Sequence, residues 1–118
     1  IYIIRLEQLY PFPYEPLTLE LKNFSNSEII WCQEEPKNMG AWGFISSRIK
    51  NILAKINAKN QTLYFIGRRA SAVPATGSYD RHLSNQKNII RLAMKASIDE
   101  VESLWEGVSL RQYKLPIE

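Results

Sequence analysis

The sequence predicts a small α/β domain of three layers, in which helices cover both faces of a small, mostly parallel sheet. Short apolar runs rich in β-branched and aromatic residues alternate along the chain with longer segments of helical periodicity, an order typical of such sheets. The length of 118 residues suits one domain, and 45% apolar residues supply a core. No apolar run approaches the roughly 20 residues of a membrane span, so we expect no membrane association.

The first part of the chain predicts a strand, a helix and a second strand. Residues 1–9 are rich in Ile and Tyr, which favours a strand. The prolines in 11–16 cannot continue a hydrogen-bonded ladder, and Pro16 suits the first turn of a helix over about 15–24. The compact apolar run at 28–33 predicts the second strand.

A loop over 34–40 leads to a helix over about 41–58. Its apolar residues recur at helical spacing and define one face: Ile45, Ile49, Ile52, Leu53 and Ile56. A third strand is predicted over 62–66, ended by Gly67. The loop that follows, 68–77, is rich in small residues.

A last helix is predicted over 79–97, with Leu83, Ile90, Ala93 and Met94 along one side. A short amphipathic segment follows, with Ile98, Val101, Leu104 and Trp105 as its apolar residues. We expect residues 1–118 to form a single domain that is the C-terminal fragment of a much larger protein. Because the chain starts abruptly in strand-like sequence, we expect the sheet to be truncated at its N-terminal side. Residues 98–118 are interpreted as a C-terminal extension.

The net charge of +3 conceals an uneven distribution. Residues 48–96 carry ten Lys and Arg against Asp80 alone, whereas residues 1–47 and 97–118 are both acidic. A basic block indicates either an anionic partner, such as a phosphate-bearing ligand, or simply solvated helix faces. Nucleic-acid binding is not expected, because the aromatic residues fall mainly in predicted core strands and do not interleave with the basic ones.

Motifs for common chemistries are absent. There is no glycine-rich nucleotide fingerprint and no nucleophile elbow. One cysteine and one histidine exclude an internal disulfide and make a metal centre rich in these residues implausible, so no metal site is predicted. Cys32 falls within a predicted buried strand, where a cysteine is usually a small hydrophobic residue. His82, near a helix start, suits either a surface position or a phosphate contact.

Glu34 and Glu35 come at the end of a predicted parallel strand, where open α/β folds place ligands and functional loops. Two adjacent carboxylates could do acid–base work. The alternative is that one forms a salt bridge and the other faces water.

Three blocks of sequence carry a resemblance to a known family. Residues 5–13 read R-L-E-Q-L-Y-P-F-P and include Arg5 and Glu7; residues 31–42 read W-C-Q-E-E-P-K-N-M-G-A-W; residues 64–77 read Y-F-I-G-R-R-A-S-A-V-P-A-T-G. In this order they resemble the C-terminal domain of the thiamine diphosphate-dependent first component of the 2-oxoglutarate dehydrogenase complex. Arg69 stands where members of that family often have proline.

The resemblance implies a transketolase-like C-terminal domain in an enzyme that oxidatively decarboxylates 2-oxoglutarate in the tricarboxylic acid cycle and passes the succinyl group to a lipoyl arm. It implies thiamine diphosphate and Mg in the parent enzyme, bound outside this fragment, which would itself be inactive and hold no catalytic residue. A sister enzyme acting on 2-oxoadipate would look the same here. The implied partners are a second copy, in a homodimer, and the dihydrolipoyl succinyltransferase component. The expected location is the bacterial cytoplasm, or the mitochondrial matrix in a eukaryote.

The residues of the longest block also have a physical interpretation. Pro36 and Gly40 would shape a tight strand-to-helix loop, and Asn38 could bond the backbone of its own turn. Trp42 and Phe44 offer large apolar area, either for an interface or for the core.

Basic residues on the predicted loops give a second candidate site. Lys37, Arg68 and Arg69 follow strands, so we expect them to gather at one edge of the sheet, and with His82 they are the candidates for an anion site. Two hypotheses follow. The domain supports the active site and holds the enzyme dimer together; alternatively, it is a regulatory module that binds a phosphorylated metabolite such as AMP or acetyl-coenzyme A.

Overall fold

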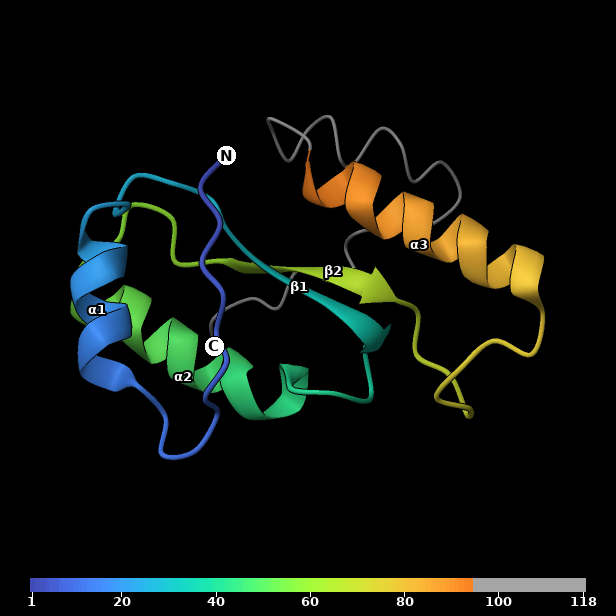
Figure 1. Ribbon diagram of the computed structural model, residues 1–118. Helices are drawn as coiled ribbons and strands as arrows, with labels where there is room; N and C mark the ends of the chain where they lie inside the picture. Colours follow the sequence, from blue (N-terminus) through green and yellow to red (C-terminus); the bar gives the residue numbers. More distant parts are fainter. Residues whose placement is uncertain (95–118) are drawn as a thin grey trace.

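The computed structural model describes residues 1–94. Its elements follow the order α1 (Tyr14–Lys22), β1 (Ile29–Pro36), α2 (Trp42–Lys55), β2 (Leu63–Arg68) and α3 (Tyr79–Ala93), as Figure 1 shows. The end of the last predicted helix, the amphipathic segment over 98–105 and the extension over 98–118 lie outside the described residues. No helix within the described part is both long and apolar enough to cross a lipid bilayer.

The predicted three-layer α/β architecture is confirmed. Strands β1 and β2 pair in parallel, with Ile29 opposite Leu63 and Trp31 opposite Phe65. Helices α1 and α2 lie on one side of this small sheet and α3 lies on the other (Figure 1).

The predicted first strand is wrong. Residues 1–9 form neither helix nor strand, so the described sheet has two strands and not three. The segment packs on α1 and the turn after it instead: the Tyr2 hydroxyl donates to the Glu20 carboxylate of α1 at 2.7 Å, and the Tyr2 ring lies 4.5 Å from the Phe24 ring of the turn. A strand needs a neighbouring strand for its hydrogen bonds, and β-branched composition alone does not supply one.

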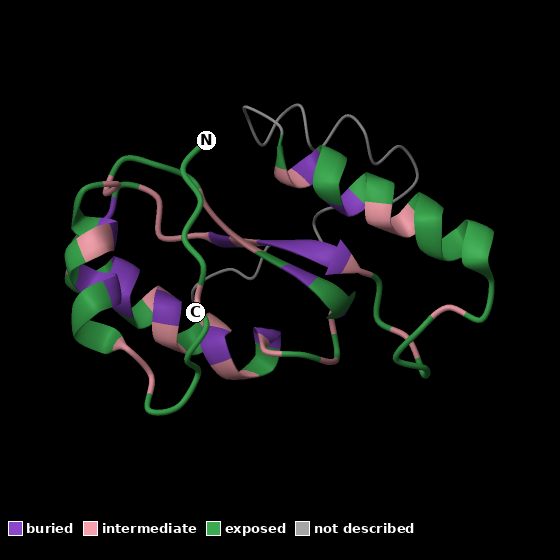
Figure 2. Cartoon of the chain, in the orientation of Figure 1, coloured by how far each residue is buried: buried purple, intermediate pink, exposed green. Residues whose placement is uncertain are grey.

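The core divides according to which way each strand residue points, as expected for a period of two. Ile29, Trp31, Leu63 and Phe65 face α1 and α2, where the larger apolar cluster lies. Ile30 and Ile66 face α3, where they meet Ile89 and Leu92. Figure 2 shows the fully buried members of these clusters as purple ribbon along much of β2 and part of α2, whereas the start of β1 is pink.

The predicted apolar face of α2 is confirmed as its buried face. Ile45, Ile49, Ile52 and Leu53 are all buried. The helix ends at Lys55, three residues before the predicted end, because Asn57 takes a positive φ of 51°. A left-handed residue of this kind is a common helix stop.

The other boundaries moved by small amounts. Helix α1 includes Pro16 in its first turn, as predicted. Gly67 does not end β2 but lies inside it, and Arg68 is its last residue. In α3 the side chains that face the sheet are Ile89 and Leu92. The predicted apolar side of that helix, with Leu83, Ile90 and Met94, is exposed.

Candidate functional site

The loops at the carboxyl ends of β1 and β2 form the candidate site, and Gln33 organises the first of them. Its buried side-chain Nε2 donates to the carbonyl of Met39 at 2.8 Å and to that of Pro36 at 3.2 Å. Its Oε1 accepts from Trp31 Nε1 at 2.8 Å and from the backbone N–H of Trp42 at 3.1 Å. One amide thus closes the β1–α2 loop and satisfies a free N–H in the first turn of α2.

Gly40 completes this turn as the sequence predicted. Its φ is +66°, a conformation that side chains rarely adopt, and a Cβ there would stand 3.0 Å from Gln33 Nε2 and 3.1 Å from the Glu35 side chain. Pro36 is fully buried at the end of β1. The tight loop is therefore a close fit between a glycine and the buried amide.

Asn38 joins the two loops. Its side-chain Nδ2 donates to the Ser71 carbonyl at 2.9 Å, and its Oδ1 accepts from the Ser71 N–H at 3.0 Å. The prediction that Asn38 bonds the backbone of its own turn is wrong. The pairing with Ser71, 33 positions away, forms only after both strands have paired, so the turn sequence could not reveal it.

The backbones of the basic residues Lys37 and Arg68 meet at this edge of the sheet, where the sequence predicted them. The Lys37 N–H donates to the Arg68 carbonyl at 3.0 Å. The Arg68 guanidinium is engaged by backbone: Nε donates to the Glu34 carbonyl at 2.6 Å and Nη2 donates to the Pro74 carbonyl at 3.0 Å. Partial burial lowers the pKa of the Lys37 ammonium.

The other two candidates for the anion site are Arg69 and His82. Arg69 is exposed immediately after β2, and His82 is exposed in the first turn of α3. The side chain that caps that helix is Ser78, whose hydroxyl accepts from the Arg81 N–H at 3.5 Å.

The Glu34 side chain and the Glu35 backbone bond to different partners. The Glu34 carboxylate accepts from Gln86 Nε2 at 2.8 Å, which links β1 to α3. The Glu35 carbonyl accepts from Gln33 Nε2 at 3.3 Å. Neither the acid–base interpretation nor the salt-bridge interpretation anticipated the bond to Gln86.

Trp42 belongs to the core. Its ring meets the Phe65 ring edge-on at 5.1 Å, and only 5% of the residue is exposed. Phe44 is half-buried, with the Arg48 guanidinium 3.7 Å above its ring and the Phe12 ring at 6.4 Å. Of the two alternatives for Trp42, interface and core, the structure selects the core.

Cys32 is exposed, so the prediction of a buried cysteine is wrong. It lies on β1 opposite Ile66, on the α3 side of the sheet. Partial burial and the nearby Glu34 carboxylate raise the pKa of the thiol, which lowers the fraction present as thiolate.

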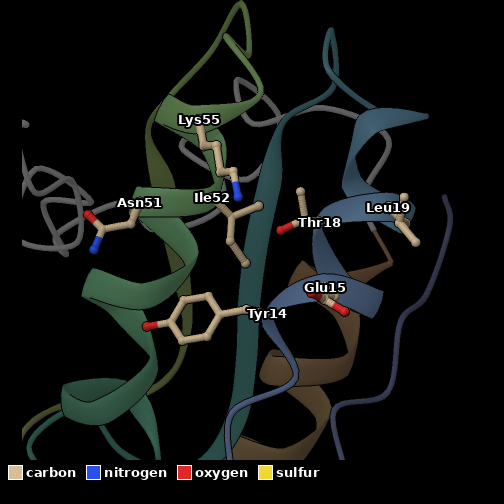
Figure 3. A pocket seen from close by; sticks show the side chains of 7 residues that line it. All are labelled: Tyr14, Glu15, Thr18, Leu19, Asn51, Ile52 and Lys55. Carbon is tan, nitrogen blue, oxygen red and sulfur yellow. The ribbon is translucent and has the colours of Figure 1, made fainter.

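A shallow pocket of about 460 Å³ opens between α1 and α2, away from these loops (Figure 3). Tyr14, Thr18 and Leu19 line it from α1, and Asn51 and Lys55 from α2. In Figure 3 the Lys55 amine points toward the Thr18 side of the pocket.

Comparison with known proteins connects this geometry to a family. A family model described as 2-oxoglutarate dehydrogenase C-terminal matches residues 1–94. The chain belongs to the 2-oxoglutarate dehydrogenase C-terminal family. Relatives from Brucella anthropi, Brucella ovis and Brucella abortus, each named 2-oxoglutarate dehydrogenase E1 component, are 52% identical to it over 84 residues. That match covers 71% of this chain and 8% of each relative.

The structure assigns physical roles to much of the family block at 31–42. Gln33, Gly40 and Trp42 build the loop and its anchor in the core, and Asn38 ties it to the next loop. Arg5 and Glu7, in the first block, form an exposed ion pair at 2.7 Å.

Sequence reasoning missed three participants in this site: Gln33, Ser71 and Gln86. A detectable signal existed only for Gln33, an amide inside an apolar run, because a polar side chain in that position must find partners when the strand is buried.

Proposed function

We propose that this chain is the C-terminal part of a 2-oxoglutarate dehydrogenase E1 component, an enzyme that decarboxylates 2-oxoglutarate oxidatively and transfers the succinyl group to the lipoyl arm of a dihydrolipoyl succinyltransferase. Membership of the family and the 52% identical relatives support this proposal. We further propose a cytoplasmic location if the source is a bacterium, or the mitochondrial matrix if it is a eukaryote.

We assign no cofactor ligand to residues 1–94. Thiamine diphosphate is held through a magnesium ion in enzymes of this kind, and no three His, Cys, Asp or Glu side chains come together within the described part of the chain to hold a metal. No chemical step is therefore derived for these residues. Because the chain spans only 8% of its relatives' length, we place the cofactor on the remainder of the enzyme.

The role we propose for the domain is to support the thiamine-binding domains and hold the homodimer together. The observation that carries this role is the exposed apolar surface of the N-terminal segment. Ile1 and Ile3 are 73% and 74% exposed, and Tyr10 is 86% exposed. Apolar side chains concentrated in one segment in this way are typical of an interface, and Trp42, buried in the core, cannot provide it.

Functional replacement tests this proposal. The part of the Brucella abortus relative that corresponds to residues 1–94 of this chain is replaced by those residues, and decarboxylation of 2-oxoglutarate is measured with ferricyanide as electron acceptor. We expect the chimera to keep at least about a tenth of the relative's turnover, a barrier change below about 1.4 kcal/mol. A chimera that folds but has no activity would refute the proposal.

Two variants of the active chimera test whether the N-terminal segment is the surface that supports catalysis. Ile3→Ser with Tyr10→Ser, made in the active chimera, should lower turnover strongly. Val73→Ser, at a 56% exposed position on the β2–α3 loop, should leave it unchanged. Equal activity of all three proteins would show that the N-terminal segment does not support catalysis.

We propose a regulatory anion site as the second candidate function, because the Lys37–Arg68 backbone bond puts Lys37, Arg68 and the exposed Arg69 on neighbouring loops at one edge of the sheet. The proposed ligands are AMP and acetyl-coenzyme A. Titration calorimetry on the chimera, with Arg69→Ala as the variant, should give heat that the substitution reduces. Heats equal to dilution for both ligands would remove this candidate.

A further inference from the structure

The pocket between α1 and α2 has the size and the lining of a small-molecule site. Its volume of about 460 Å³ falls in the range of about 300–1,000 Å³ that is usual for such sites. Thr18 and Ile52 are the buried residues of its lining and form its base, whereas Tyr14 and Leu19 are exposed and form its sides. The pocket therefore offers an apolar surface on which a side chain of a ligand can pack.

Two charges of opposite sign stand at this pocket, one on each helix. Glu15 lies in the first turn of α1 and Lys55 in the last turn of α2. Among residues 1–94, neither side chain forms an ion pair or a hydrogen bond. Each charge suits the dipole of its own helix, but both remain available to a ligand.

The Thr18 hydroxyl adds a second donor beside Lys55. Within the described part of the chain this hydroxyl has no hydrogen-bond partner, and it is not sealed from solvent as the Thr76 hydroxyl is. In Figure 3 the Thr18 oxygen faces the α2 side of the pocket and the Lys55 amine faces the α1 side. An ammonium and a hydroxyl that donate into one space suit a carboxylate.

The position of Glu15 restricts which carboxylates fit. Glu15 and Thr18 are three residues apart, so they share one side of α1 and lie about 4.5 Å apart along its axis. A small molecule whose carboxylate reaches Thr18 is therefore close to the Glu15 carboxylate as well. A simple acid would meet a like charge there, and a simple amine would meet Lys55, whereas a zwitterion would satisfy both.

We propose that the α1–α2 pocket binds a free amino acid with an apolar side chain. The α-carboxylate of the ligand accepts from the Lys55 ammonium and the Thr18 hydroxyl. The α-ammonium group donates to the Glu15 carboxylate. The apolar side chain packs on Ile52, beside the Tyr14 ring.

An NMR titration of the whole 118-residue chain with L-leucine tests this site. We expect saturable shifts of backbone amides in α1 and α2, and none in α3. Isocaproate, which is leucine without its amino group, and isoamylamine, which is leucine without its carboxylate, are the matched probes. Each should bind at least about tenfold more weakly than leucine, because each leaves one charge of the pocket facing a like charge or no partner.

Charge-neutral variants identify the groups that bind. Glu15→Gln and Lys55→Gln should each weaken leucine binding at least about tenfold. Lys59→Gln, at an exposed position outside the pocket, should leave it unchanged. The loss of a favourable helix-dipole contact would change the unfolding midpoint but not the affinity for leucine, so the titration separates the two roles. No saturable shift with leucine, equal affinity for the three probes, or equal affinity in the three variants would overturn the proposal.

Discussion

Replacing Gln33 by methionine should destabilise the chain strongly, because its amide is the buried centre of the β1–α2 loop. Methionine has a similar length but cannot donate to the Met39 and Pro36 carbonyls or accept from the Trp42 N–H. A buried polar group left without a partner costs about 1–3 kcal/mol. At least two groups lose their partner, so we expect a loss of about 3 kcal/mol after allowing for the apolar gain of methionine.

Urea unfolding of the 118-residue chain, followed by circular dichroism, measures this loss. With a slope of about 1.5 kcal/mol per molar urea, the unfolding midpoint should fall by about 2 M. Gln8→Met is the matched control: Gln8 Nε2 donates to the Pro11 carbonyl at 2.9 Å from an exposed position, where water can replace it. A shift for Gln33→Met no larger than that for Gln8→Met would refute the central role of Gln33.

Gln33→Glu separates the hydrogen bonds from packing. The charged carboxylate would point an oxygen at carbonyls that now accept from Nε2, whereas the protonated acid could still donate. We therefore expect the folded-state pKa of the new acid to lie above its unfolded value of about 4.3. The variant should recover stability relative to the native chain as the pH falls through that raised pKa; a pH-independent deficit would contradict the mechanism.

Three further predictions concern the same loops. Gly40→Ala should lower the free energy of unfolding by about 2 kcal/mol, because it forces a side chain into a φ of +66° against Gln33. Gly43→Ala is the control: a Cβ there meets nothing within 4 Å, so the same urea assay should find it neutral or stabilising by about 0.5 kcal/mol. Equal effects of the two substitutions would exclude the backbone argument. Asn38→Ala should speed amide hydrogen exchange in the β2–α3 loop by about tenfold, which corresponds to a loss of about 1.4 kcal/mol in local opening free energy, and should leave exchange in α2 unchanged. Unchanged exchange in the loop would show that the two loops are held independently. Iodoacetamide at pH 8 should alkylate the Cys32 thiol more slowly in the folded chain than in urea, because partial burial and the adjacent Glu34 carboxylate raise the pKa of the thiol. Glu34→Gln removes that carboxylate and should raise the alkylation rate. A rate that the substitution does not change would leave burial as the whole cause of the raised pKa.

Elements with local signals were predictable from the sequence. Helix α2 shows its buried face through the periodicity of Ile45, Ile49 and Ile52, and Pro36 and Gly40 indicate the tight strand-to-helix loop that the structure contains. These features depend on neighbours within a few residues. The pattern of the chain therefore contains them.

Features that depend on distant neighbours were not predictable in the same way. Residues 1–9 have strand composition but no strand partner in the described structure. Asn38 and Ser71 meet only after β1 and β2 pair. Whether Cys32 is buried depends on how far α3 extends over the sheet, which periodicity within β1 does not encode.

The mass in solution of the chimeric E1 component tests the assembly role of the domain most directly. Light scattering on the active chimera should give the same mass as the unaltered Brucella abortus relative, and Val73→Ser should not change it. Ile3→Ser with Tyr10→Ser should lower the mass to that of a single subunit, because these exposed side chains are placed in the dimer-supporting surface. An unchanged mass together with full activity in that double variant would contradict the proposal that the N-terminal face of this domain holds the enzyme together.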